Sequence, residues 1–410
     1  MNNEKNNLIK KTSGRAATSF AFVLALIIPL LCGCSIAGAR DEAAAPLVTP
    51  LDENLVVIQD AQMPDALSGE DDAAPEESDA GAILQTSNAG EETPAPSISA
   101  TTGRILPEDA VYRPVLIVID NAAQSRPQTG LMLADVVYEI PLDRTDHATR
   151  YLAVFSDEIP RCAGPVRDSR AYLADVAAEW GGLYVSAGDP ENIPDGYSML
   201  QDAGLELSVK NEGDAAPFFY TDKTVTAIEE HTVFFKALEY ADAYYDDSGA
   251  VRAERFLFES NVYYEKGKAF ESVGIPFTSS DAERVVFTYD ENTNLMTRSD
   301  KNSKDVLGVS KTLTPADNVL GYENEPISVQ NLIVQYVRIS SFDTTFRTIA
   351  VTGSGDCEYF INGQHVIGTW SRPTIDDTTT YQLYDGTIIR LEPGNTWIEM
   401  MPVSHKISVR

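Results

Sequence analysis

The apolar residues of this chain form two patterns, short continuous runs and runs with helical spacing, and each predicts a different kind of secondary structure. A continuous β-branched run at residues 114–120 is typical of a strand that is buried on both faces. Residues 136–141 and 150–155 predict two further strands, and residues 183–187 predict a fourth. All four strands fall in the part of the sequence that follows residue 104 and precedes residue 190.

Helical spacing occurs between and after these strands. Thr129 is placed to cap a short helix over residues 129–135, and Ser169 is placed to cap a longer helix that reaches Trp180. Between Ser169 and Trp180 the apolar residues recur at the helical period. A third helix is predicted over residues 227–243.

This alternation of strands and helices predicts an α/β layered domain over residues 105–260. A second, mostly β domain is predicted over residues 284–404. Its short strands, at residues 285–289, 332–337 and 348–351, are separated by turns rich in Asp, Asn and Gly. The fold class is therefore α+β, with an N-terminal α/β layered domain followed by a mostly β C-terminal domain.

The N-terminus carries the pattern of an export signal. Four basic residues precede an apolar stretch at residues 20–31, which is long enough for a signal-peptide core but short for a membrane span. The stretch ends in Leu-Cys-Gly-Cys at residues 31–34, which resembles a bacterial lipobox. We expect residues 1–33 to be a lipoprotein signal peptide and Cys34 to carry the lipid. An ordinary secretory signal or an uncleaved anchor are the alternatives.

Residues 34–104 have the composition of a disordered acidic linker. From Ser35 to Arg104 there are 14 acidic and 2 basic residues, with abundant Ala, Pro and Ser and few aromatic residues. Such a segment buries too little apolar surface to offset the entropy lost on ordering. It is predicted to tether the folded part to the membrane through the lipid on Cys34.

The charge of the chain excludes some partners and leaves others open. The net charge of −31 makes nucleic acid an improbable partner, because phosphate binding needs clustered Lys and Arg. Cys162 and Cys357, the two cysteines that follow Cys34, could form one disulfide, but two separate thiols are the preferred interpretation.

Familiar catalytic and metal-binding motifs are missing from the sequence. It has no nucleophile elbow, no His-Glu-x-x-His and no Walker loop. The segment at residues 290–301 departs from a calcium loop at Leu295 and Lys301. The four histidines are scattered singly, so we expect neither a metal site nor a cofactor.

Arginines concentrate in one window of this otherwise acidic chain. Arg167 and Arg170 are three residues apart at the start of a predicted helix, so both can project from one side and hold a carboxylate or phosphate. Internal bracing by ion pairs is the competing interpretation. The candidate ligand-binding residues are Arg126, Asp135, Tyr138, Glu139, Arg150, Arg167, Ser169 and Arg170.

Two sets of segments carry a resemblance to a known family. The first set, in the arginine-rich part of the chain, is residues 113–115, 126–131, 134–139, 149–150 and 164–170. The second set is residues 331–335, 355–363, 368–370, 386–387 and 391–398. These segments resemble the first and second DUF3048 regions of the YerB-like lipoproteins. The resemblance implies an exported lipoprotein with an α/β region followed by a β region, and it implies no particular activity.

Three functions are consistent with these features. The leading hypothesis is a non-catalytic, extracytoplasmic lipoprotein, anchored to the bacterial cell membrane, that binds an anionic small molecule or envelope component in an arginine-lined cleft. The second is an envelope hydrolase or transferase that uses Asp135 or Glu139 as general acid or base. The third is a scaffold that docks an envelope protein, through Trp370 or Trp397 if either is exposed.

Overall fold

The computed structural model describes the following parts of the chain: residues 97–142, 149–188, 205–209, 214–223, 228–246, 249–250, 255–277, 285–300, 309–311, 325–341 and 347–410. The predicted signal peptide, Cys34 and linker residues 35–96 lie outside the described residues. Among the helices of the described parts, none combines the length and the apolar character needed to cross a bilayer.

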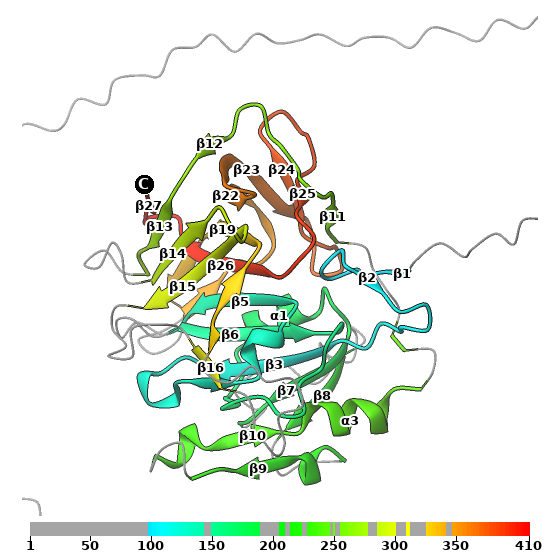
Figure 1. The fold of residues 1–410 in the computed structure, drawn as a ribbon. Helices are drawn as coiled ribbons and strands as arrows, with labels where there is room; N and C mark the ends of the chain where they lie inside the picture. The colour runs from blue at the N-terminus through cyan, green and yellow to red at the C-terminus, as the bar shows by residue number, and fades with distance from the viewer. Residues whose placement is uncertain are drawn as a thin grey trace, which may run out of the picture. The chain divides into compact units, whose positions relative to one another are not determined.

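One sheet of eleven strands organises the described residues (Figure 1). Ten of its strands follow one another across the sheet, and β24 (Thr380–Leu383) pairs with β23 beside them. In spatial order the ten are β12 (Lys268–Ala269), β23 (Gln364–Arg372), β22 (Gly353–Ile361), β19 (Asn331–Val337), β26 (Thr396–Pro402), β5 (Val136–Pro141), β6 (Thr149–Phe155), β3 (Val115–Asp120), β7 (Gly182–Ser186) and β8 (Leu205–Val209).

The two predicted domains share this sheet. Strand β26, from the C-terminal part, lies parallel to β5, from the N-terminal part (Figure 1), and pairs Thr396 with Val136 through to Glu399 with Glu139. Every residue of β5 and β26 is buried. The hydrogen-bond ladder is therefore continuous from one half of the described chain to the other.

A second sheet covers one face of the C-terminal half. Its strands, in order, are β18 (Ser328–Val329), β15 (Leu295–Asp300), β14 (Val285–Asp290), β13 (Ser272–Ile275) and β27 (Ser408–Val409). Phe287 and Met296 of this sheet belong to the same buried cluster as Phe360 and Trp397 of the large sheet. The alternation of buried and exposed residues along β15 fits a strand with one buried face.

Two α-helices lie in the described residues of the N-terminal half, one on each face of the sheet. Helix α1 (Ala171–Ala177) belongs to the cluster that contains Leu116 and Val118, and α3 (Ala237–Tyr244) belongs to the cluster that contains Val115 and Ile117. The layering is as predicted, but the described chain is mostly β and has few helices.

Short elements join these layers. Small strand pairs are formed by β9 (Phe219–Thr221) with β10 (Val233–Phe235), β11 (Leu257–Phe258) with β25 (Arg390–Leu391), and β20 (Ile339–Ser341) with β21 (Arg347–Ile349). A three-stranded group contains β4 (Gln128–Thr129), β16 (Val309–Lys311) and β17 (Glu325–Pro326). Single 3-10 turns occupy Ala123–Ser125, Leu131–Leu133, Ala216–Phe218 and Glu229–His231.

Two helix predictions were wrong in part. Thr129 does not cap a helix, because it lies in β4 and only a 3-10 turn follows at Leu131–Leu133. The segment predicted as a helix over residues 227–243 is helical only from Ala237, because Val233–Phe235 form β10. A β-branched residue followed by two aromatic residues favours a strand when a partner such as β9 is available.

The predicted end of the linker was also wrong. Residues 97–104 belong to a hairpin of β1 (Ser97–Ile98) and β2 (Ile105–Leu106), and Thr101 and Thr102 are fully buried. The Thr101 hydroxyl donates to Asp135 Oδ2 at 2.7 Å, and the Thr102 hydroxyl donates to Asp157. Composition alone could not reveal these bonds, because the carboxylates lie more than 30 residues away in sequence.

A chain that begins at Ile105 is therefore expected to melt several degrees below a chain that begins at Ser97. Loss of residues 97–104 removes the hydrogen bonds that Thr101 and Thr102 donate to Asp135 and Asp157. Each such bond contributes about 0.5–1.5 kcal/mol. Calorimetry of both chains measures the difference, and Thr101→Val in the longer chain is the matched control. Equal melting temperatures would show that the hairpin does not stabilise the fold.

Candidate functional site

The carboxyl ends of three parallel strands meet at one edge of the large sheet. Strands β3, β7 and β8 run parallel to one another, and β6 runs antiparallel to β3. Asp120 is the last residue of β3 and is paired in register with Arg150, near the start of β6. In open sheets with parallel strands, ligands bind beyond the carboxyl ends of the strands.

Asp120 is held as a carboxylate by three donors. Its Oδ2 accepts hydrogen bonds from Ser125 Oγ at 2.6 Å and from His231 Nδ1 at 2.5 Å, and its Oδ1 accepts one from the Ala122 amide at 3.1 Å. Burial by itself would raise the pKa of Asp120, but the Ser125 bond and the positive charge of Arg167 outweigh burial and lower that pKa. His231 is itself buried.

Asp168 is surrounded by three guanidinium groups. Its carboxylate lies 3.0 Å from Arg150 Nη1 and 3.7 Å from Arg167 Nε, and it also accepts a hydrogen bond from Arg170. Burial alone would raise the pKa of Asp168, but the charges of Arg150 and Arg170 lower it. Arg150, Arg167 and Arg170 are named the arginine cluster below.

The arginine cluster keeps donors that these carboxylates do not satisfy. The Nε atoms of Arg150 and Arg167 are buried and have no hydrogen-bond partner among the described residues. Arg167 also donates to the Glu230 carbonyl at 2.8 Å, and its side chain is 20% exposed. Three guanidinium groups meet the carboxylates of Asp120 and Asp168 and the exposed carboxylate of Glu230, which lies 3.5 Å from Arg167 Nη1.

The structure places the eight predicted site residues in four places. Arg150, Arg167 and Arg170 lie together, and Ser169 lies beside them with its hydroxyl hydrogen-bonded to the Tyr184 hydroxyl rather than capping α1. The other four residues are elsewhere. Tyr138 packs in the buried cluster that also contains α1, where its hydroxyl accepts a hydrogen bond from Trp180 at 3.3 Å.

Arg126 and Glu139 belong to a buried ionic network. It lies next to the pairing of β5 with β26, which is named the seam between the two halves below. Arg126 forms an ion pair with Asp300 at 2.8 Å. Glu139 Oε2 accepts hydrogen bonds from Arg298 Nη2 at 2.8 Å and Nε at 3.2 Å, and Glu139 Oε1 accepts one from Thr149 at 2.7 Å. These contacts brace the fold, as the competing interpretation of the arginines expected.

Asp135 is a buried structural group. Its Oδ2 accepts hydrogen bonds from Thr101 and from the Ser156 and Asp157 amides at 2.7–3.0 Å. Burial, together with the negative charge of Asp157, raises the pKa of Asp135 to about 8. Asp135 and Glu139 are each only 1% exposed, so neither is open to solvent as an acid–base catalyst would need to be.

The tryptophans and cysteines are core residues. Trp370 and Trp397 are 2% and 1% exposed, so neither offers the docking surface that the scaffold hypothesis required. Large aromatic side chains at the centre of a sheet remove much apolar area from water, which explains their burial. Cys162 and Cys357 are both buried and both free, which confirms the prediction of two separate thiols.

Sequence reasoning missed Asp120, Ser125 and His231 as members of the site. An acidic residue at the end of a fully buried strand was a usable signal for Asp120. No local signal pointed to His231, because it reaches Asp120 across 111 residues of chain.

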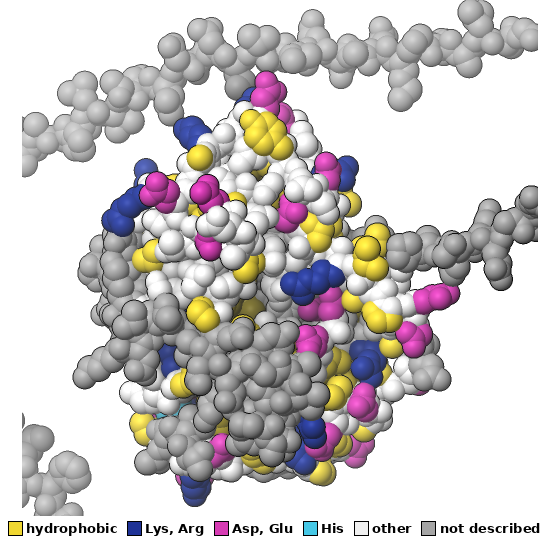
Figure 2. Space-filling view, viewed as in Figure 1, with side chains coloured by type: hydrophobic (Ala, Val, Ile, Leu, Met, Phe, Trp, Pro, Cys, Tyr) yellow, Lys and Arg dark blue, Asp and Glu magenta, His cyan; other side chains and the backbone are white. Residues whose placement is uncertain are grey.

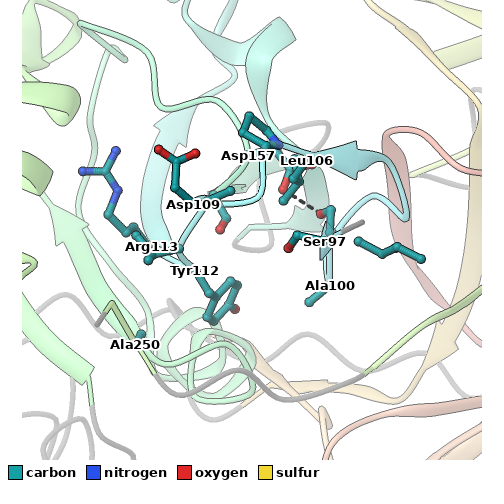
Figure 3. Close-up of a pocket in the computed structure, with 14 residues that line it drawn as sticks. Ser97, Ala100, Leu106, Asp109, Tyr112, Arg113, Asp157 and Ala250 are labelled. Atoms are coloured by element: carbon teal, nitrogen blue, oxygen red, sulfur yellow. Dashed lines mark hydrogen bonds between the residues drawn. The ribbon is translucent and has the colours of Figure 1, made fainter. Parts of the chain in front are cut away.

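A pocket of about 570 Å³ lies at the opposite end of β3, beside the N-terminal hairpin (Figure 3). Its lining residues come from distant parts of the chain, including Ser97, Tyr112, Asp157 and Ala250. None of the eight predicted residues lines it. Arg113 at its rim is paired with Asp242 at 2.8 Å.

Two family models match the chain. Residues 101–250 match the N-terminal domain of a protein of unknown function, DUF3048, and residues 273–398 match the C-terminal domain of the same family. Together these matches span both halves of the large sheet.

A relative and a solved structure agree with these matches. The chain is 22% identical over 298 residues to the "Putative lipoprotein YerB" of Bacillus subtilis (strain 168), covering 71% of this chain and 81% of that protein. The crystal structure of YerB protein from Bacillus subtilis matches with a TM-score of 0.60 at 20% identity, covering 77% of this chain and 99% of that one. At this identity the structural match supports the fold alone.

Proposed function

Because the chain belongs to the YerB-like lipoprotein family, we propose that it is a lipid-anchored extracytoplasmic protein that binds an anionic ligand at the arginine cluster. The ligand is a small molecule or an envelope component that carries a carboxylate or phosphate group. The observation that carries the proposal is the convergence of three guanidinium groups on Asp168, with buried Nε atoms of Arg150 and Arg167 that have no hydrogen-bond partner among the described residues.

The anchor is supported by the lipobox-like residues 31–34 and by the name of the relative. Each methylene group of an acyl chain that enters the bilayer contributes about 0.8 kcal/mol, so two or more chains on Cys34 hold the protein firmly. Cys34→Ala is expected to abolish labelling by a clickable fatty acid and to move the protein out of the membrane fraction. Cys32→Ala is the control and should keep the label. Persistent label on Cys34→Ala would refute the anchor.

The anion site is supported by charge and by geometry. A guanidinium group presents several donors in a plane and binds carboxylate or phosphate through two of them at once. The buried Nε atoms of Arg150 and Arg167 have no hydrogen-bond partner among the described residues, and an anion could accept from them.

Arg167→Ala is expected to weaken binding of inorganic phosphate or citrate by about 1.5–3 kcal/mol and to leave the melting temperature nearly unchanged. Its side chain is the most exposed of the three, and after truncation Asp120 keeps its hydrogen bonds from Ser125, His231 and the Ala122 amide. Calorimetric titration measures the affinity, and thermal melts measure the stability. Arg167→Lys keeps the charge but not the planar group, and it should restore binding only in part.

Arg113→Ala is the matched control, because Arg113 is also a partly exposed arginine in an ion pair but lies away from the cluster. It should leave phosphate affinity unchanged. Bracing predicts a different result: Arg167→Ala and Arg170→Ala would both unfold the protein readily, and the parent chain would bind neither phosphate nor citrate. That result would overturn the anion site.

A further inference from the structure

A second pocket, remote from the arginine cluster, lies at the other end of the large sheet. It has a volume of about 490 Å³ and is formed around β23 by β12, β24 and the residues before β12. This volume lies within the range of small-molecule sites in proteins. Figure 2 shows exposed hydrophobic side chains between basic and acidic ones at this end of the molecule.

The pocket opens where the edge of β23 is left uncovered. Strand β12 pairs with Gln364 and His365, and β24 pairs with β23 from Gly368 onward. Val366 and Ile367 lie between them without a ladder partner on that edge among the described strands. A gap of two residues is too short to accept an added peptide strand, so the pocket favours a small or ring-shaped ligand.

One wall of the pocket is a fixed, exposed aromatic ring. Tyr384 is 60% exposed, yet its hydroxyl donates to Asp356 Oδ1 at 2.9 Å, which restricts the orientation of the ring. Ile367, which is 53% exposed, and Leu383 add apolar surface near it. A rigid ring with two side-chain torsions loses little entropy when a ligand stacks on it.

The pocket also contains an oriented histidine. His365 Nε2 lies 2.6 Å from Glu358 Oε2, and the Tyr336 hydroxyl donates to Glu358 Oε1 at 2.6 Å. Burial alone would raise the pKa of Glu358, but the hydrogen bonds from His365 and Tyr336 lower it, so Glu358 is a carboxylate. In the neutral tautomer that donates from Nε2 to Glu358, Nδ1 is an acceptor. The imidazole also stacks on Phe360, with ring centroids 4.6 Å apart.

The charges of the residues that line the pocket balance. Lys266 and Lys268 oppose Glu265 and Asp385, and Lys266 Nζ lies 3.8 Å from Asp385 Oδ2. A balanced lining gives no net attraction to an anion. The pocket thus combines a stacking ring, an imidazole nitrogen and lysine donors with no excess of positive charge among its lining residues.

We propose that this pocket binds an uncharged pyranose ring of a glycan, with one apolar face of the sugar on Tyr384 and a sugar hydroxyl donating to His365. A wholly apolar ligand fits less well, because it would remove the imidazole nitrogen and the lysines from water without replacing their hydrogen bonds. The site is independent of the anion site, and either can be correct without the other.

The test uses the full chain in detergent and three uncharged probes: trimers of glucose, of N-acetylglucosamine and of mannose. Saturation-transfer NMR should show contact with at least one trimer, and titration should give its affinity. Tyr384→Ala should weaken that affinity about tenfold, as expected for loss of a stacked ring in partly exposed surroundings. His365→Phe keeps the stacking on Phe360 but removes the acceptor, and it should also weaken binding.

Tyr263→Ala is the matched control, because Tyr263 is 75% exposed on the neighbouring segment but does not line the pocket. It should leave the affinity unchanged, as should Arg167→Ala. The proposal is overturned if no trimer binds, if Tyr384→Ala binds as the parent chain does, or if Tyr263→Ala loses binding equally. Melting curves of each variant confirm that a loss of affinity does not reflect unfolding.

Discussion

Replacing Arg298 with alanine is expected to lower the free energy of unfolding by about 3–5 kcal/mol, because it removes one partner of a buried ion pair. Arg298 is 1% exposed and donates two hydrogen bonds to Glu139. Its guanidinium also lies 5.3 Å from the Trp397 ring centroid and 5.7 Å from that of Tyr151. Without Arg298, the buried Glu139 carboxyl group has lost its cationic partner and keeps only the neutral donors Asn121 and Thr149. Urea unfolding at neutral pH measures the loss.

The control for Arg298→Ala is an exposed ion pair. Arg390 is half exposed and lies 3.3 Å from Glu259, which is equally exposed. Surface substitutions of this kind change stability by no more than about 0.5 kcal/mol. If Arg298→Ala and Arg390→Ala have the same small effect, the buried network does not contribute to stability in the way described.

Glu399 adds a pH dependence to the same network. Burial, and then the negative charge of the adjacent Glu139, raise the pKa of Glu399. A carboxyl group with a raised folded-state pKa binds more protons in the folded than in the unfolded state. The free energy of unfolding therefore falls as pH rises from the unfolded-state pKa to the folded-state pKa of Glu399. Glu399→Gln should be more stable than the parent chain at pH 8 and should differ less at pH 5. The pKa of Asp135 is raised as well, so Asp135 also makes the parent chain less stable as pH rises. The effect of Glu399 is therefore the difference in unfolding free energy between Glu399→Gln and the parent chain at each pH.

The parts of the fold that were predicted correctly depend on local sequence. Strands β3, β5 and β6 were predicted within one residue, because a strand buried on both faces needs a continuous apolar run. The first part of the helix predicted over residues 227–243 was wrong because Val233–Phe235 pair with β9 and form a strand. Strand β9 lies more than ten residues before Val233 and was not predicted. Propensity is a weak guide when a tertiary partner competes.

The candidate site was predictable only where its members are close in sequence. Arg167 and Arg170 are three residues apart in the segment that leads into α1, and their proximity followed from spacing. Arg150 joins them through the pairing of β6 with β3. Apolar patterns predict the two strands but not which residues pair in register. Glutamate is a common acid or base in active sites, so residue type alone made Glu139 a candidate. Its role is structural because it is paired with Arg298, which lies 159 residues away in sequence.

Residues 97–250, produced without the rest of the chain, are expected to be insoluble or to lack a cooperative unfolding transition. Strand β5 would become an edge strand although all six of its residues are buried in the whole protein, and an exposed apolar edge promotes aggregation. Glu139 would lose Arg298, and Tyr151 would lose the edge-to-face contact with Trp397 at 5.3 Å. Both changes expose core groups that no residue of this half can cover.

A second set of contacts joins the two halves on the other face of the sheet. Arg372, which is fully buried in β23, lies 3.2 Å from Glu179 and donates to the Asp175 carbonyl at 2.8 Å. Glu179 also accepts hydrogen bonds from the Thr379 amide and hydroxyl at 2.7 and 2.8 Å. Separating the halves would leave Glu179 and Arg372 each without its opposite charge.

Co-production tests whether the seam is the cause. Residues 97–250 and 255–410, expressed together as two chains, should assemble, co-elute and unfold in one transition, because the ladder between β5 and β26 needs no covalent connection. Arg298→Ala in the second fragment should weaken this assembly, and Arg390→Ala should not. If residues 97–250 alone fold cooperatively with a melting temperature near that of the whole chain, the halves are separate domains that merely touch. Failure of the single fragment together with recovery by its partner would instead establish one folding unit built from two family regions.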